Sequence, residues 1–93
     1  MIIEPKSRRV YLKGEEINFP NKEFDLLLFL AKNKGLVFSK KELLDRVWGM
    51  DAFINEATVA VHINRIRAKI EKDSLEAEYI ETLWGAGYRF VAE

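Results

Sequence analysis

The chain has 93 residues, its 15 basic and 15 acidic residues give a formal net charge of zero, and it contains no cysteine. This length suits one small domain spanning residues 1–93, and the lack of cysteine excludes a disulfide framework and any cysteine-ligated metal. The longest apolar run, LLLFLA, is far shorter than the roughly 20 residues of a membrane span, and without a signal peptide the expected location is the cytoplasm.

The first twenty residues are expected to form short antiparallel strands. Two runs with alternating polarity, residues 9–13 and 16–19, are joined through Gly14. Ile2 and Ile3 suggest a third strand, which ends at Pro5. Residues 1–20 are therefore assigned to an N-terminal antiparallel sheet.

Three helices are expected in residues 21–72, and the second has the clearest local signal. The first is expected to be capped by Asn21 and to stop at Gly35. In the segment FSKKELL, Ser39 and Glu42 have the spacing of a capping box. Phe38 precedes the cap and Leu43 lies at the fourth helical position, so the two are placed to form a hydrophobic staple. We expect this second helix to end at residue 49, a glycine.

The third helix is expected to start after Asn55 and to run to about Lys72. Its helical wheel places four branched aliphatic residues on one inward stripe, namely Val59, Ile63, Ile66 and Ile70. One flank is cationic and contains no carboxylate from this helix: Thr58, His62, Arg65, Lys69 and Lys72. The opposite flank carries the acids, and there Arg67 can pair with Glu71 at i,i+4.

This cationic flank allows a neutral chain to bind a polyanion locally. The outer side of the helix carries only small residues, Ala57, Val61 and Ala68, so the helix is slim enough for a groove about 12 Å wide. Arg65 and Lys69 could then reach bases or phosphates. An ordinary solvated helix face is the alternative interpretation of the same pattern.

Two strands, YIETLW and YRFV, close the chain and are joined by the turn GAG. Residues 79–91 are therefore expected to form a β-hairpin. Strands, three helices and a terminal hairpin in this order define an α+β fold of the winged helix-turn-helix type. In that fold the last helix enters the major groove and the hairpin, or wing, touches the DNA backbone or minor groove.

Several motifs in the same order resemble the OmpR/PhoB-type winged-helix output domain of two-component response regulators. They are KEFDLLLFLAKNKGLVFSKKELLDRVWG for the first two helices, TVAVHINRIRAKI for the recognition helix and YIETLWGAGYRF for the wing. The resemblance covers nearly the whole chain. It implies a bacterial transcriptional regulator in a phosphorelay, an N-terminal sheet of four strands, and a head-to-tail homodimer on direct-repeat half-sites of double-stranded promoter DNA.

The resemblance also implies roles for individual residues. Those expected to meet DNA, together with Lys69 from the helical wheel, are Trp48, Thr58, Val61, His62, Asn64, Arg65, Arg67 and Arg89. Thr58, Val61 and Arg65 would approach bases, whereas His62, Arg67 and Trp48 would approach phosphates. The loop after the second helix is linked to RNA polymerase in this family, through Met50, Asp51, Phe53 and Ile54, although these residues could equally cover the core.

Three positions depart from the family pattern. Ala57 stands where an arginine is usual, and Ala60 stands where an aspartate is frequent. Trp84 replaces a frequent arginine before the wing turn, and it could pack on sugars, wedge between bases, fold back on the sheet or contact a second copy. Two further residues keep two interpretations each: Arg67 as an ion-pair or phosphate-binding residue, and Trp48 as a core or phosphate-binding residue.

No βα repeat precedes these elements, so the receiver domain is expected to be absent from this chain, and a sensor kinase would act only through it. No nucleophile–base pair, paired carboxylates or phosphate-binding loop is found, and we therefore expect no enzyme activity, no cofactor and no metal site. A winged-helix protein-interaction module without a role at DNA is the competing hypothesis, motivated by the zero net charge and by Trp84.

Overall fold

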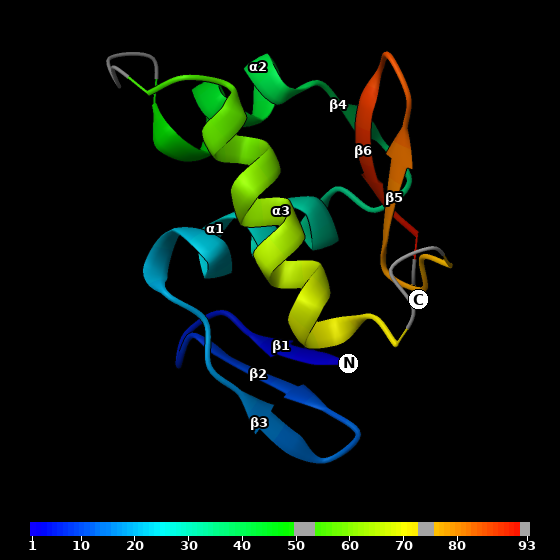
Figure 1. Cartoon of the computed structure of the whole chain (residues 1–93). Helices are drawn as coiled ribbons and strands as arrows, with labels where there is room; N and C mark the ends of the chain where they lie inside the picture. The colour runs from blue at the N-terminus through cyan, green and yellow to red at the C-terminus, as the bar shows by residue number, and fades with distance from the viewer. Residues whose placement is uncertain (50–53, 73–75, 92–93) are drawn as a thin grey trace.

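The computed structural model describes residues 1–49, 54–72 and 76–91. Its helices lie between an N-terminal sheet and a C-terminal sheet (Figure 1). In chain order the elements are β1 (Ile2–Glu4), β2 (Arg9–Leu12), β3 (Glu15–Ile17), α1 (Asn21–Lys32), β4 (Val37–Phe38), α2 (Lys40–Leu43), the π-helical η1 (Leu44–Trp48), α3 (Ala57–Ile70), β5 (Ile80–Leu83) and β6 (Gly87–Phe90). This arrangement confirms the predicted α+β winged-helix class.

The N-terminal sheet is antiparallel, with the strand order β1-β2-β3. Lys13 and Gly14 connect β2 to β3, and both have positive φ, 53° and 83°. Two positive φ values in a two-residue loop are the signature of a type I′ hairpin turn, which glycine favours. The resemblance implied four strands in this sheet, but within the described residues it has three.

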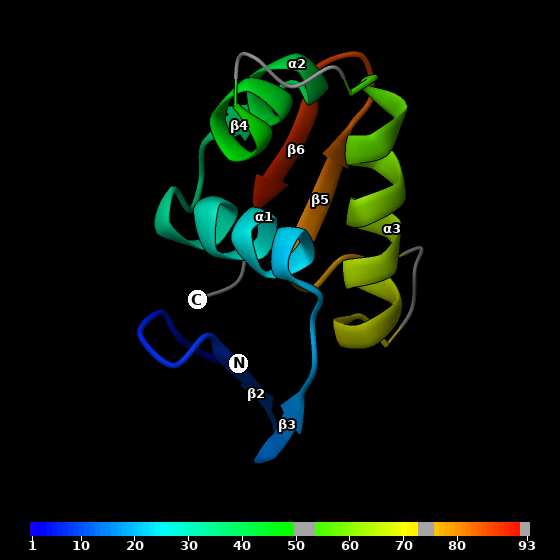
Figure 2. The ribbon, with the colours of Figure 1, turned by 90° about the vertical axis from the view of Figure 1, so that its left-hand side faces the viewer.

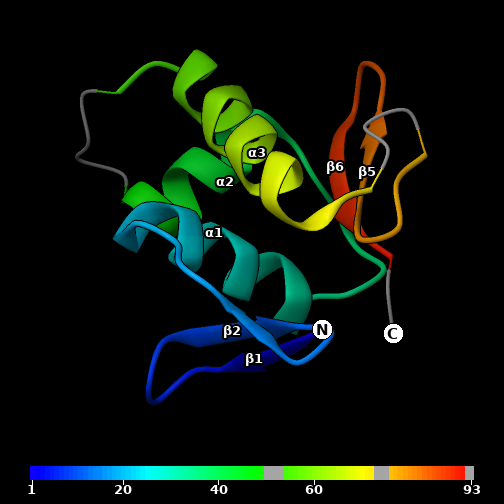
Figure 3. The same cartoon turned by 60° about the horizontal axis from the view of Figure 1, so that its bottom comes forward.

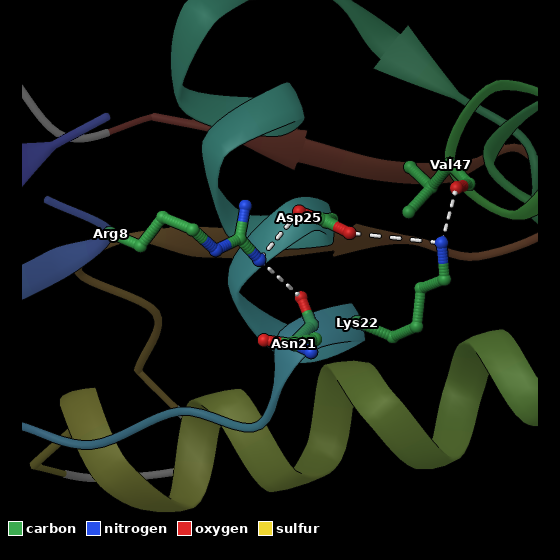
Figure 4. Close-up of polar contacts among 5 residues, drawn as sticks. All are labelled: Arg8, Asn21, Lys22, Asp25 and Val47. Atoms are coloured by element: carbon green, nitrogen blue, oxygen red, sulfur yellow. Dashed lines mark hydrogen bonds and ion pairs between the residues drawn. The ribbon is translucent and has the colours of Figure 1, made fainter. Parts of the chain in front are cut away.

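A set of polar contacts fastens the N-terminal sheet to the helices (Figure 4). One Nη2 atom of Arg8, in the turn between β1 and β2, lies 2.9 Å from Oδ1 of Asp25 and donates to the carbonyl of Asn21 at 3.1 Å. Lys22 continues the connection, because its Nζ lies 3.7 Å from Asp25 and donates to the carbonyl of Val47 at 3.2 Å. The first turn of α1 is thereby tied both to the sheet and to η1.

The ends of α1 differ from the sequence expectation. Asn21 is already the first helical residue and no side chain caps the helix, so the predicted Asn21 cap is wrong. The helix ends at Lys32, before the expected stop at Gly35. Asn33 follows the last helical residue, and its backbone N–H and its Nδ2 both donate to the carbonyl of Phe29, at 3.2 and 2.8 Å.

The capping box at the start of α2 is confirmed. The Ser39 hydroxyl accepts from the backbone N–H of Glu42 at 3.1 Å, and the Glu42 carboxylate accepts from the backbone N–H of Ser39 at 2.8 Å. Hydrogen bonds from the Ser39 backbone and side chain lower the pKa of Glu42. Phe38 and Leu43, the predicted staple, are both buried in the core.

Ser39→Ala is expected to lower the free energy of unfolding by about 1 kcal/mol at pH 7, because the N–H of Glu42 loses its acceptor. Urea denaturation measures this difference. The lowered pKa of Glu42 means that its contribution is present above its unfolded-state pKa and is lost as the pH falls through the folded-state pKa. Both proteins should therefore lose stability in acid, because residue 39 keeps the backbone N–H that binds the Glu42 carboxylate in the variant. Ser7→Ala, on the exposed N-terminal turn, should change stability by less than about 0.5 kcal/mol.

The second half of the predicted second helix is π-helical. The N–H of Gly49 donates to the carbonyl of Leu44, five residues earlier, at 3.1 Å. Gly49 then ends the helix with φ of 101°, a value that glycine adopts without strain, as the sequence predicted. A π-helical turn holds an extra residue, which changes the direction in which Trp48 points.

The C-terminal sheet contains the predicted hairpin and one strand that the sequence did not reveal. Its order is β4-β6-β5, and all neighbours are antiparallel. β4 was missed because it has only two residues, Val37 and Phe38. At Gly87, the first residue of β6, an added Cβ would lie 2.0 Å from the carbonyl oxygen of Phe38. The hairpin therefore approaches β4 so closely that only glycine fits at position 87.

The core lies between α1, α3 and the C-terminal sheet. Figures 2 and 3 show these elements from two further directions. The side chains that are completely buried come from all these elements, from α2 and from β2: Val10, Leu26, Leu27, Leu30, Leu43, Val59, Ile63, Ile66 and Ile80. Within the described residues, every helix falls short of the length and apolar character that crossing a membrane requires.

Candidate nucleic-acid interface

The direction of α3 is fixed by the predicted aliphatic stripe. Val59, Ile63 and Ile66 have no exposed surface, and Ile70 is 3% exposed. Four buried aliphatic side chains spaced along one helix leave it little freedom to rotate. The side of α3 opposite to them must therefore face solvent.

The outer side of α3 is exposed and slim, as expected. Ala57, Val61 and Ala68 are exposed, and so are Asn64 and Arg65 on the two flanks beside them. Arg65 forms no ion pair with any carboxylate in the described part of the chain. Its guanidinium, with five N–H donors, is therefore available to a ligand that approaches this side.

The hairpin lies next to this side of α3. In Figures 1 and 2 it runs alongside α3, and its tip lies at the end where α3 begins. The sequence predicts Asn55 as the cap of α3, but the N-cap residue is Glu56, and Asn55 Oδ1 accepts from the backbone N–H of Ala57 at 2.6 Å. The helix ends at Ile70, two residues before the expected end, because Glu71 is already extended. The first turns of α3 and the hairpin tip together form the candidate interface.

His62 and Trp48 contact each other at the border of the interface. The Nδ1 atom of His62 lies 2.8 Å from the carbonyl oxygen of Thr58, and a carbonyl only accepts, so Nδ1 carries the proton. The His62 and Trp48 rings meet edge to face, with centroids 4.9 Å apart. Trp48 is half-buried and packs against the core, which agrees with its predicted core role.

Arg67 points toward the hairpin and away from the outer side of α3. Its Nη2 donates to the carbonyl of Ile80 at 2.9 Å and to the hydroxyl of Thr82. The guanidinium lies 5.6 Å from the ring centroid of Tyr88, and burial lowers the pKa of Arg67. The Nε of Arg67 is buried without a partner among the described residues.

The predicted ion pair between Arg67 and Glu71 is wrong. The Glu71 carboxylate accepts instead from the backbone N–H groups of Glu78, Tyr79 and Ile80, at 2.7, 3.1 and 2.9 Å. The cause is the chain reversal after α3, which brings the start of β5 beside Glu71. These three backbone N–H groups would otherwise lack acceptors there, and the carboxylate accepts from all of them.

Lys69 also points away from the outer side. Its Nζ lies 3.0 Å from Glu23, whose side chain is 3% exposed, and it donates to the carbonyl of Asn18 at 3.0 Å. The ammonium lies 4.8 Å from the Phe19 ring centroid. The predicted cationic flank therefore meets a carboxylate at its C-terminal end, contributed by α1, which the wheel of a single helix cannot reveal.

Two predicted residues lie on the hairpin. Arg89 on β6 pairs with Glu81 on β5, with Nε 3.0 Å from the carboxylate. Trp84 at the tip is 93% exposed, so folding back onto the sheet is wrong for this residue. Contact with DNA sugars, a wedge between bases and contact with a second copy remain open for it.

The loop predicted to meet RNA polymerase is described in part. Met50, Asp51 and Phe53 lie outside the described residues. Ile54, its last member, is half-buried.

One surface groove was not predicted from the sequence. A groove of about 300 Å³ lies between the start of α2 and the hairpin tip. Lys40 and Lys41 line it together with Trp84, and Lys41 pairs with Asp45 at 3.6 Å. The adjacent lysines after the capping serine were a signal for this groove, whose lining also includes Glu56. Within the described residues, no group of three or more His, Cys, Asp or Glu side chains could hold a metal ion.

The sequence matches a known family model and known regulators. The model, described as "Transcriptional regulatory protein, C terminal", matches residues 14–90. The response regulator SaeR of Staphylococcus aureus is 48% identical over 84 residues, which cover 90% of this chain and 37% of SaeR. The chain therefore spans little more than a third of the length of that relative.

Solved structures resemble the whole fold. The response regulator DrrB, a Thermotoga maritima OmpR/PhoB homolog, has a TM-score of 0.89 and 41% identity, over 97% of this chain and 41% of DrrB. The DNA-binding domain of Klebsiella pneumoniae RstA, solved in complex with the RstA box, has a TM-score of 0.85 and 31% identity, over 96% of this chain and 88% of that domain. The DNA-binding domain of Bacillus subtilis CssR has a TM-score of 0.81 and 36% identity, over 97% of this chain and 98% of that domain.

Proposed function

Because the chain belongs to the family of transcriptional regulatory protein C-terminal domains, the winged-helix output domains of OmpR/PhoB type, we propose that it binds double-stranded DNA at promoters. In this proposal α3 enters the major groove and the hairpin lies on the DNA backbone or in the minor groove. The observation that carries it is the exposed, slim outer side of α3, with Arg65 available on it. The complex of the RstA domain with the RstA box supports it by analogy.

Base contacts are assigned to the outer side of α3. Arg65 can bond bidentately to O6 and N7 of guanine. The methyl groups of Thr58 and Val61 can pack on a thymine methyl, and the amide of Asn64 can bond to a base edge or a phosphate. The exposure of Val61, Asn64 and Arg65 supports these roles.

Phosphate contacts are assigned to His62 and Trp48 beside this surface. Since Nδ1 of His62 is already bonded to Thr58, Nε2 is the ring atom left for a phosphate. Nε2 donates a hydrogen bond only when both ring nitrogens are protonated, so this contact needs a charged imidazole. Trp48 can add its indole N–H, a donor that needs a partner wherever it is shielded from water.

Lys69 and Arg89 are assigned weaker contributions to DNA binding. Lys69 gives two contacts to Glu23 and Asn18, which leaves one of its three N–H donors for a phosphate. Arg89 shares its charge with Glu81. Both residues therefore add less to the positive potential of this surface than a free cation would.

Further partners belong to the same proposal. A second copy binds head to tail on direct-repeat half-sites, and RNA polymerase contacts the loop of residues 49–54. In the whole protein a sensor kinase acts through a receiver domain, and the site of action is the bacterial cytoplasm, where the chromosome lies. Selection from a random duplex library tests the half-site arrangement, because two copies must give two sites at a fixed spacing.

DNA binding is expected to weaken as salt rises, because cationic side chains that meet phosphates release counterions. About three phosphate contacts would lower the affinity by about 40-fold between about 50 and 200 mM salt. Mobility-shift titrations at these two concentrations measure the change.

The competing protein-interaction function is favoured by one observation, the 93% exposed Trp84. It requires that no salt-dependent shift of duplex DNA occurs and that random-library selection enriches no sequence. Either positive result would exclude it as the main function of the chain.

A further inference from the structure

Arg67 connects three elements that carry the interface. It belongs to α3, its two hydrogen-bond acceptors Ile80 and Thr82 belong to β5, and the ring of Tyr88 beneath it belongs to β6. α3 and β5 lie side by side in Figures 1 and 2. The guanidinium is therefore a bridge between the helix and the hairpin.

The surroundings of this guanidinium suit a bridge better than a phosphate contact. Arg67 is half-buried, and its Nε is shielded from water without a partner in the described part of the chain. Both N–H donors of Nη2 are used by the carbonyl of Ile80 and the hydroxyl of Thr82, and breaking these two bonds would be costly. Nη1 is the nitrogen left for a ligand.

We propose that Arg67 is a positioning residue that sets the angle between α3 and the hairpin through Thr82. The inference rests on the proposed function for its consequence at DNA, since a wing at the wrong angle cannot bind together with α3. The bridge itself exists in the free protein and can be measured without DNA.

The first test uses the protein without DNA and two variants that are expected to fold. Arg67→Lys keeps the charge but loses the two-pronged donor, and Thr82→Val removes the hydroxyl from a strand position that valine suits. In both variants, NMR order parameters of the hairpin amides should fall from about 0.85 toward about 0.6, while those of α3 stay unchanged. Unchanged hairpin order parameters in both folded variants would overturn the proposal.

The second test measures DNA affinity in the same variants. Each single variant should weaken binding by about tenfold and the double variant by no more than either single one, because the two residues act as one unit. The slope of affinity against salt should stay that of the unmodified protein, and Arg9→Lys on the N-terminal sheet should have no effect.

The alternative outcomes are distinct. A direct phosphate contact predicts near-normal affinity for Arg67→Lys, no effect of Thr82→Val, and for Arg67→Ala a salt slope reduced by about 0.9. That result would overturn the positioning role while leaving DNA binding intact. If the unmodified protein binds no duplex DNA, the proposed function fails, and the order parameters still decide whether Arg67 positions the hairpin.

Discussion

Arg65→Ala is expected to weaken binding to a cognate duplex by about 1–3 kcal/mol, which is about 5- to 150-fold in affinity. The side chain is exposed on the outer side of α3, and four buried aliphatic residues hold that side outward. Loss of a bidentate arginine removes two hydrogen bonds to one base, so discrimination at that base pair should relax as well. Fluorescence anisotropy titration with the selected site and with single-base variants of it measures both effects.

Arg9→Ala is the matched control for this prediction. Arg9 is also exposed, and its ion pair with Glu16 is long, 3.9 Å, but it lies on β2 in the N-terminal sheet. Its removal costs the same formal charge without touching α3. Equal losses of affinity for the two variants would mean that net charge, and not the α3 surface, governs binding.

Lys69→Met is expected to lower the free energy of unfolding by about 1–3 kcal/mol. It leaves the Glu23 carboxylate, 3% exposed, without its cation, and an unpaired buried charge is costly. The value is below that for a fully buried pair because the Lys69 side chain is 34% exposed and water screens the interaction. Urea denaturation at pH 7 measures the loss.

The second variant and the control make this prediction specific. Glu23→Gln in the Lys69→Met background should recover part of the stability, because the neutral amide no longer needs a cation. Lys34→Met, at an exposed lysine beyond α1, should change stability by less than about 0.5 kcal/mol. No rescue by Glu23→Gln would show that the loss comes from the lysine's packing on Phe19 and not from the stranded carboxylate.

Local sequence signals predicted the parts of the fold that depend on neighbours in the chain. The Ser39–Glu42 box needs residues three apart, and the stripe from Val59 to Ile70 needs only the period of a helix. Both are present as predicted. They place α3 and its outer side, which is why the candidate interface could be located before its geometry was known.

The hydrogen-bond partners of two long cationic side chains could not be predicted from local signals. Arg67 reaches a hydroxyl 15 residues away and Lys69 reaches a carboxylate 46 residues away. Partners at that distance in sequence are brought near only by the tertiary fold. The flexible stems of arginine and lysine then follow the nearest acceptors, whichever flank of the helix they start from.

The direction of Trp48 was hidden for a different reason. Residues 44–48 have the composition of an ordinary helix, but they form a π-helical turn. The extra residue in such a turn rotates the side chains that follow it by about 100° relative to an α-helical count. This rotation, which no residue type marks, accompanies the contact between Trp48 and His62.

Gly87 and Trp84, three residues apart on the hairpin, are under opposite packing constraints. Any side chain at position 87 would collide with the carbonyl of Phe38, so this residue, directly after the turn, is closed to change. Two residues before it, at Gly85, an added Cβ would meet nothing within 4 Å, although φ of 83° still favours glycine, and Trp84 beside it projects into solvent. The residue at position 84 can therefore change in size and charge without disturbing the core, while the contact between residue 87 and β4 admits only glycine.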